Sequence, residues 1–207
     1  MASSANFGAF LRAAADAYRA SGDPDAPKIA DRIAQHAKNA VLEPPPRRPP
    51  PAIKYLATVA SSPDLHPAAR LITGDLANLA WTVGDLEVPA VLRDHFAFVT
   101  FIGEESPIPD DELYFGLFLV APHTHYPLHW HLAEELYFVL SSTSHWEQGD
   151  GLFRPQAPGT LIHHLPNEPH AMATGEAPLL AMWVWYGDLR PDTYRLDVKR
   201  GARPPGR

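Results

Sequence analysis

Two histidines and a glutamate stand close together near the middle of the chain. His129 and His131 are separated by one residue, and Glu135 follows four residues later. Side chains two residues apart on an extended strand point to the same face, so the two imidazoles can project together. If residues 132–134 turn the chain, Glu135 falls on one face of a returning strand over residues 136–140. Two imidazoles and a carboxylate then converge, as a catalytic metal site with open coordination positions requires.

A fourth donor from a separate strand would complete the protein side of this site. His170, at the end of the segment 166–170, is placed to supply it, whereas His163 and His164 are not expected to bind the metal. If His170 faced away, His164 would replace it. The chain has no cysteine, so the donors must be nitrogen and oxygen. We expect one divalent transition metal, with Fe, Zn or Mn favoured but its identity not readable from these donors. The predicted ligands are His129, His131, Glu135 and His170.

Length, composition and charge restrict the class of protein. The chain has 207 residues, 45% of them apolar and 20% charged, which fits one globular domain with an appendage. A formal charge of −7 without long Lys/Arg clusters argues against a nucleic-acid partner. No apolar stretch approaches ~20 residues and no charged region precedes an apolar run at the start. We therefore expect a soluble, cytoplasmic protein with no membrane partner.

The first part of the chain has a helical pattern. We expect a helix capped by Asn6 and further helices over residues 25–40, 53–61 and 67–78. Prolines dominate residues 44–51, which predicts an extended connector because proline restricts φ and lacks a donor. This part has too few large apolar residues to bury a core alone. Residues 1–82 are therefore predicted to form a helical N-terminal extension packed on the rest of the chain.

From residue 83 the pattern changes to short apolar runs separated by turn residues. Regular short strands with tight turns predict a small antiparallel barrel or double-sheet roll over residues 83–198, followed by a C-terminal tail over 199–207. The expected strands are 97–101, 113–120, 128–131, 136–140, 144–148, 151–154, 160–163, 170–173 and 179–186.

The order of these motifs is similar to the two-part signature of cupin barrels. His-x-His-x-x-x-Glu, from His129 to Glu135, is followed by the turn Pro158-Gly159 and then by Pro169-His170. The resemblance implies a mainly β protein. The predicted fold is a cupin (double-stranded β-helix or jelly-roll) barrel with an α-helical N-terminal layer.

More specifically, the chain resembles the cupin-type dimethylsulfoniopropionate (DMSP) lyases. The matching segments are residues 124–137, 166–172 and the aromatic strand 183–186. The resemblance implies a metal-dependent lyase that cleaves DMSP to dimethyl sulfide and acrylate. It also implies that the four predicted ligands hold a divalent metal and that Tyr126 and Tyr137 are candidates for the catalytic base.

The implied reaction is a β-elimination, and it explains why a metal and a tyrosine would be needed. The proton to be removed lies next to a carboxylate and is weakly acidic, so a metal bound to that carboxylate helps as a Lewis acid. A free tyrosine has a pKa of about 10, and a nearby cation lowers it. Tyr137, two residues after Glu135, is the favoured base. Tyr126, three residues before His129, is either the base instead or a group that orients the substrate.

The sulfonium group of the substrate needs aromatic faces, because it is a soft cation without a strong hydrogen-bond partner. Trp183 and Trp185 share one face of the last strand, and Tyr186 points the other way. These three residues and His125, which has the same strand parity as His129, are the predicted substrate contacts.

Two other functions remain open at this stage. An Fe(II) site of this composition also serves cupin dioxygenases and isomerases acting on another small acid or sugar. A non-catalytic cupin would use its metal only to hold a ligand, although two positioned tyrosines count against that reading. The expected partner is a small zwitterionic or carboxylate substrate, and a homodimer is left open.

Overall fold

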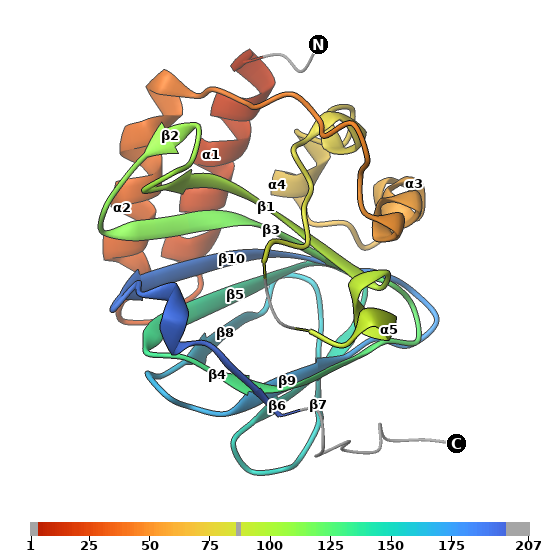
Figure 1. The fold of residues 1–207 in the computed structure, drawn as a ribbon. Helices are drawn as coiled ribbons and strands as arrows, with labels where there is room; N and C mark the ends of the chain where they lie inside the picture. The colour runs from red at the N-terminus through yellow and green to blue at the C-terminus, as the bar shows by residue number, and fades with distance from the viewer. Residues whose placement is uncertain (1–3, 86–87, 198–207) are drawn as a thin grey trace.

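Two β-sheets facing each other, with helices outside the larger one, form the molecule (Figure 1). The computed structural model describes residues 4–85 and 88–197. This arrangement confirms the predicted mainly β cupin barrel with a helical N-terminal layer. Apart from the parallel pair β1–β2, the neighbouring strands of the described chain run antiparallel.

The larger sheet has six strands and the smaller has five. The larger runs in the order β2 (Ile108–Pro109), β1 (Phe96–Gly103), β3 (Leu113–Val120), β10 (Leu179–Gly187), β5 (Ala133–Ser141) and β8 (Leu161–His164). The smaller runs in the order β11 (Arg195–Asp197), β4 (His125–Trp130), β9 (His170–Ala173), β6 (Ser144–Gln148) and β7 (Arg154–Gln156).

Two long helices and several short ones make up the helical part. The α-helices are α1 (Ser4–Ala20), α2 (Ala26–His36), α3 (Leu56–Ala60), α4 (Pro67–Arg70) and α5 (Ala90–Arg93). The 3₁₀ helices are η1 (Ala37–Asn39), η2 (Pro51–Tyr55), η3 (Leu76–Asn78) and η4 (Pro191–Thr193).

Several predicted helix boundaries are wrong. Asn6 lies inside α1 instead of capping it, and the helix predicted over 25–40 ends at His36 before a 3₁₀ turn. The helix predicted over 67–78 breaks after Arg70 into turns. Gly74 lies in this broken stretch, and glycine costs about 1 kcal/mol in a helix interior. The break still buries Ile72 and Leu76 against the core.

The larger sheet is buried on both faces, and β5 illustrates the alternation. Leu136, Phe138 and Leu140 belong to the core shared with the helices. Tyr137 and Val139 point the other way, into the core between the two sheets. Since side chains alternate along a strand, this division decides which residues of every strand in the larger sheet can reach the barrel interior.

The helical layer shares its core with the larger sheet. Phe7 of α1 lies 4.8 Å from Phe101 of β1, and Phe10 lies 6.2 Å from Phe115 of β3, measured between ring centroids. Residues 40–50, which include most of the proline-rich segment, form neither helix nor strand. The domain limits at 82/83 and 198/199 stay predictions, and the tail 199–207 lies outside the described residues.

Several strands differ from expectation: β2 was not predicted, and β4 and β5 begin three residues before the predicted strands 128–131 and 136–140. The strand predicted over 151–154 begins only at Arg154, because Gly149 and Gly151 adopt positive φ in a turn and the Gly151 N–H donates to Glu147. Strand β11 follows the last predicted strand, pairs with β4 and had not been expected. It closes the edge of the smaller sheet next to the candidate site.

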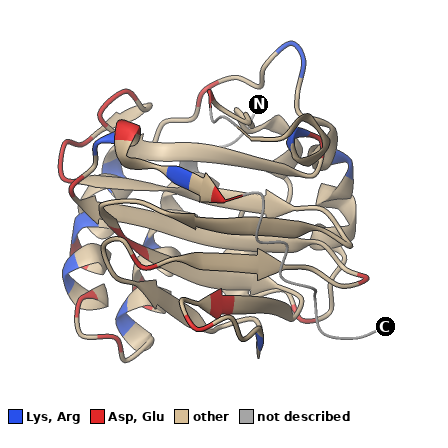
Figure 2. Cartoon of the chain, turned by 60° about the horizontal axis from the view of Figure 1, so that its bottom comes forward, with Lys and Arg blue, Asp and Glu red and all other residues tan. Residues whose placement is uncertain are grey.

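Charged residues of both signs are interspersed on the helices and loops, whereas the strands are mostly uncharged (Figure 2). Within residues 4–85 and 88–197, no helix combines the length and the apolar character needed to cross a bilayer. The cytoplasmic location and the homodimer stay predictions.

A buried carboxylate ties α2 to the sheet. Asp110, after β2, receives hydrogen bonds from Arg32 Nε at 2.7 Å and Nη2 at 3.0 Å, and its Oδ2 lies 2.7 Å from His36 Nε2. Burial by itself would raise the pKa of Asp110, but these partners and the Glu112 N–H outweigh it and lower that pKa to about 2. The ionised carboxylate therefore stabilises the contact between the helical layer and the barrel.

Asp110→Asn should lower the free energy of unfolding at pH 7 by about 2 kcal/mol, because Arg32 loses a buried partner. A carboxyl group with a lowered pKa stabilises the fold above its unfolded pKa, and that contribution disappears as the pH falls toward 2. The difference from the wild type in urea denaturation should therefore shrink in acid. Asp111→Asn is the control, since Asp111 is exposed and 3.8 Å from Arg32; an equal loss there would contradict the prediction.

Candidate active site

Three predicted metal ligands meet inside the barrel from three strands. His129 lies on β4, Glu135 on β5 and His170 on β9, and one potential ligand atom from each lies within 4.8 Å of the others. His129 and His170 are directly paired across β4 and β9. All three side chains are buried. The fold therefore brings together residues that are up to 41 positions apart in the sequence.

His131, the fourth predicted ligand, lies at the edge of this group. β4 ends at Trp130 and β5 begins at Ala133, so the turn is one residue earlier than predicted and contains His131. Its Nε2 atom is 3.1 Å from Glu135 Oε2. His131 thus contacts the group through Glu135.

The backbone selects the same tautomer in all three histidines. Nδ1 lies 2.9 Å from the Pro127 carbonyl in His129, 2.9 Å from the Ala133 carbonyl in His131 and 2.8 Å from the Glu168 carbonyl in His170. A carbonyl oxygen only accepts, so each Nδ1 carries the proton and donates it. In a neutral ring the Nε2 lone pair is then free, which is the usual arrangement of a metal-binding histidine.

A carboxylate lies at the centre of the group. Glu135 Oε2 lies 3.1 Å from Nε2 of both His131 and His170. Burial would raise the pKa of Glu135, but the two imidazoles beside its carboxylate outweigh burial and hold that pKa well below its usual range. Nitrogen lone pairs facing a carboxylate repel it unless the rings take up a second proton or a cation lies between them. The donor set therefore fits a divalent metal ion.

His129 is held neutral. Burial first, and the neighbouring His170 second, lower its pKa well below the usual value. A neutral ring with its Nδ1 proton on a carbonyl is ready to offer Nε2 to a metal.

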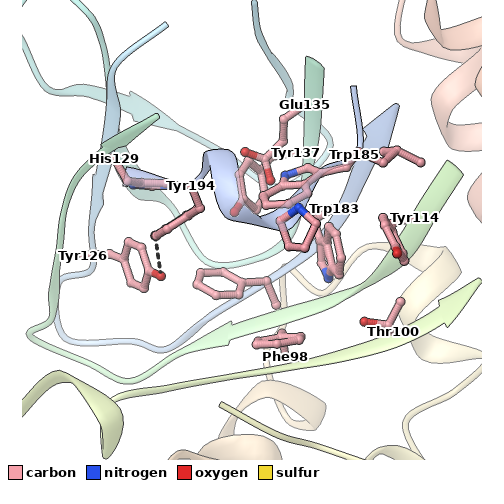
Figure 3. Close-up of a pocket in the computed structure, with 13 residues that line it drawn as sticks. Phe98, Thr100, Tyr114, Tyr126, His129, Glu135, Tyr137, Trp183, Trp185 and Tyr194 are labelled. Carbon is pink, nitrogen blue, oxygen red and sulfur yellow. Dashed lines mark hydrogen bonds between the residues drawn. The ribbon is translucent and has the colours of Figure 1, made fainter. Parts of the chain in front are cut away.

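Three tyrosines lie beside His129 and Glu135 (Figure 3). Tyr137 comes from β5 and Tyr126 from β4, and both are buried. The Tyr126 hydroxyl lies 3.0 Å from that of Tyr194, which precedes β11 and packs its ring over His129 at 5.5 Å. Burial, followed by the charge of Glu135, raises the pKa of Tyr137 well above 10. Burial also raises the pKa of Tyr126, so both phenols are protonated in the protein without a cation.

An aromatic cavity of about 210 Å³ opens beside these groups. His129 and Glu135 line it, and Figure 3 shows Tyr137 and Trp185 next to Glu135. The lining residues are Phe98, Thr100, Tyr114, Phe118, Tyr126, His129, Glu135, Tyr137, Trp183, Trp185, Leu189, Pro191 and Tyr194.

Trp183 and Trp185 bring two unsatisfied donors to this cavity. Each indole Nε1 atom is buried and has no hydrogen-bond partner in the described part of the chain. The Trp185 ring lies beside a predicted metal ligand, 4.3 Å from the ring of His131. The Trp183 ring packs instead on Phe98, at 6.2 Å. Buried donors without a partner are rare, so a bound ligand that offers an acceptor would fit here.

Tyr186, a predicted substrate contact, lies on the other side of the sheet. It follows the alternation of β10 and packs against the helical layer, outside the cavity. Its hydroxyl is 3.2 Å from Nε2 of His163, whose ring also bonds Asp23 and Glu134 at 2.8 Å each. Tyr186 thus joins the helices to the barrel, and its predicted contact with the cavity is wrong.

His125 also lies outside the cavity. The register between β4 and β9 shifts between Tyr126 and His129, around Pro127, so the parity argument that aligned His125 with His129 is wrong. Tyr126 faces the ligand group instead. The His125 ring packs on Phe153 at 5.7 Å and lines a separate pocket with Glu147.

The family of the chain follows from comparison with known proteins. A model of the dimethylsulfoniopropionate lyase family matches residues 25–181. The chain belongs to the DMSP lyase family. The DMSP lyase DddQ of Ruegeria pomeroyi is 32% identical over 151 residues, which cover 70% of this chain and 73% of that protein.

Solved structures of DMSP lyases resemble it over nearly the whole chain. The crystal structure of DddQ from Ruegeria pomeroyi DSS-3 is 27% identical, with a TM-score of 0.63, and covers 90% of this chain and 98% of its own. A structure described with the DMSP lyases RdDddP and RnDddQII shares the fold at 21% identity and a TM-score of 0.69, covering 93% of this chain and 98% of its own.

Sequence reasoning missed several cavity residues of this DMSP lyase family member. Phe98, Tyr114 and Phe118 lie on predicted strands, and alternation on each strand would have grouped Phe98 with Thr100 and Tyr114 with Phe118. Tyr194 had no such signal, because no motif precedes it and β11 was not predicted.

Gly116→Ala should destabilise the protein by about 2 kcal/mol or more, because a Cβ atom there would lie 1.9 Å from the Val99 carbonyl oxygen and 2.9 Å from Trp183 Nε1. Urea denaturation measures the loss, and tryptophan fluorescence should report the displaced indole. Gly74→Ala is the control, since nothing lies within 4 Å of its Cβ position; similar losses in both variants would be inconsistent with this packing.

Proposed function

We propose that the protein is a metal-dependent lyase that cleaves DMSP to dimethyl sulfide and acrylate by a tyrosine-initiated β-elimination. The observation that carries the proposal is the buried Glu135 with Nε2 atoms of His131 and His170 at 3.1 Å, beside Tyr137 in an aromatic cavity. Membership of the DMSP lyase family and the likeness to a relative named as a DMSP lyase support the substrate.

His129, Glu135 and His170 would hold the metal, with His131 as the fourth donor. Fe, Zn and Mn are the favoured ions, since all three accept imidazole and carboxylate donors. When bound, such an ion would act as a Lewis acid on the substrate carboxylate and favour the phenolate form of a nearby tyrosine. The low pKa of Glu135 and the neutral His129 prepare the donors for this at neutral pH.

Tyr137 is the proposed base. Its phenolate oxygen takes the proton from the carbon next to the substrate carboxylate, and the electrons of that C–H bond form the C=C bond of acrylate. The C–S bond breaks with its electron pair moving to sulfur, so dimethyl sulfide leaves as a neutral molecule. Tyr126, bonded to Tyr194 at 3.0 Å, orients the substrate or takes over as base.

The two indoles would bind opposite ends of the zwitterionic substrate. Trp185, beside His131, offers its Nε1–H to a carboxylate oxygen of the substrate. Trp183, packed edge-to-face with Phe98, offers an aromatic face to the sulfonium group. Aromatic walls also exclude water, which strengthens both interactions.

Metal-dependent release of dimethyl sulfide is the first expected outcome. Protein treated with a chelator should release no dimethyl sulfide or acrylate from DMSP, and Fe(II), Mn(II) or Zn(II) should restore release. Headspace gas chromatography and liquid chromatography measure the two products. Protein that binds a metal but releases neither product would overturn the substrate assignment, and consumption of O2 with another small acid would favour the dioxygenase reading.

Tyr137→Phe should lower kcat by at least ~100-fold, because it removes the base while keeping the ring. Metal content, measured on the same preparation, should stay at the wild-type level. Tyr186→Phe is the matched control on the opposite face of the sheet and should keep most of the activity. If Tyr137→Phe retains activity and Tyr126→Phe loses it, Tyr126 is the base.

Trp185→Phe should raise KM about tenfold, because it removes a hydrogen-bond donor to a charged group but keeps an aromatic face. Trp183→Phe should change KM by less than about threefold, since a phenyl ring also binds a cation. Steady-state kinetics with DMSP measure both. The opposite order of effects would reverse the roles assigned to the two indoles.

A further inference from the structure

His164 is a buried residue beside the predicted metal ligands. The proposed reaction gives it no role. It lies on β8, directly across from Glu135 in the pairing of β5 with β8. Its side chain points into the barrel interior, and none of it is exposed to solvent. Its neighbour His163 points the other way, toward Asp23 and the helical layer.

The His164 ring packs flat against a predicted metal ligand. Its centroid lies 3.9 Å from that of His170, and the two ring planes differ by 10°. Trp146 stacks on His164 at 6.3 Å with an interplanar angle of 27°, and Tyr137 meets it edge-on at 6.2 Å. These neighbours leave His164 little freedom to rotate.

Hydrogen bonds do not hold His164 in place. Neither ring nitrogen has a hydrogen-bond partner in the described residues, and the nearest carboxylate oxygen, on Glu168, is 3.8 Å from Nδ1, which is too long for a hydrogen bond. Buried polar groups without partners are uncommon and call for a reason. Packing therefore fixes the position of this ring.

His129 meets the His170 ring edge-on at 4.0 Å, and two further contacts set the orientation of that ring. Its Nδ1 donates to the Glu168 carbonyl at 2.8 Å, which selects the tautomer, but one hydrogen bond still lets the ring tilt about it. The flat contact with His164 restricts that tilt. Together they keep His170 Nε2 at 3.1 Å from Glu135 Oε2.

We propose that His164 is a positioning residue of the metal centre, whose ring fixes the plane of the His170 imidazole so that Nε2 stays directed at the metal. The inference rests on the metal centre of the proposed function.

Metal affinity of purified variants tests this role without reference to turnover. His164→Ala and His164→Gln remove the flat ring and should weaken Zn(II) binding by about 10- to 100-fold, as is usual when a residue that supports a ligand is lost. His164→Phe keeps a flat ring without nitrogens and should bind Zn(II) within about threefold of the wild type. Competition with a chromophoric chelator gives the dissociation constants, and absorption bands of the Co(II) protein report the ligand geometry.

A matched control separates positioning from loss of stability. Ile162→Ala opens a cavity on the same strand and the same face, two residues from His164 and directly across from Tyr137. It should lower the melting temperature of the metal-free protein as His164→Ala does, yet keep the Zn(II) affinity and the Co(II) spectrum. Equal weakening of Zn(II) binding in both variants would overturn the proposal, because general destabilisation would then explain it.

Three further results would each overturn a different part of this inference. Wild-type affinity in His164→Ala overturns the positioning role and leaves the metal centre intact. Weak binding in His164→Phe together with wild-type binding in His164→Gln also overturns it, because the nitrogens and not the ring would then matter. A wild-type protein that binds no Zn(II), Fe(II) or Mn(II) stoichiometrically would overturn the metal centre itself, and the inference with it.

Discussion

A carboxylate buried in the middle of the barrel is the constraint on which the rest of the site depends. Glu135 is 2% exposed, and burying an ionised carboxylate without compensation costs several kcal/mol. The imidazoles of His131 and His170 supply nitrogen atoms at 3.1 Å, but their Nδ1 protons are already donated to backbone carbonyls. A cation between them removes the conflict, which links the stability of this region to the chemistry proposed for it.

The larger sheet is what places that carboxylate. Helices cover one face and the smaller sheet covers the other (Figure 1), so the buried apolar side chains of β5 and β10 divide between two interiors. Leu136 and Phe138 anchor β5 to the helices, which turns Glu135 and Tyr137 inward. The same alternation turns Trp183 and Trp185 into the cavity and sends Tyr186 to the helical layer. A shift of one residue in strand register would turn Glu135 and Tyr137 away from the cavity and toward the helices.

The rigidity of the ligand group comes from backbone carbonyls and flat ring contacts more than from side-chain hydrogen bonds. Pro127, Ala133 and Glu168 each direct one imidazole through a carbonyl oxygen, and His164 stacks against His170. Backbone acceptors are fixed by the strands themselves and need no further ordering. Such a group can meet a metal with little rearrangement, and that favours both affinity and speed.

The sequence by itself indicated the candidate ligands and the strand that carries Glu135 and Tyr137, because alternation and the His-x-His-x-x-x-Glu spacing are local properties, and the resemblance of this spacing to the cupin signature indicated the fold. Only the tertiary structure decided which residues from distant segments meet at the site. The irregularity at Pro127 reversed the parity between His125 and His129, and β11 brought Tyr194 over the site. The stacking of His164 on His170 likewise joins two strands whose separation is set only when the sheets close on each other. Contacts between distant segments depend on register and on sheet closure, and neither is written in a run of neighbouring residues.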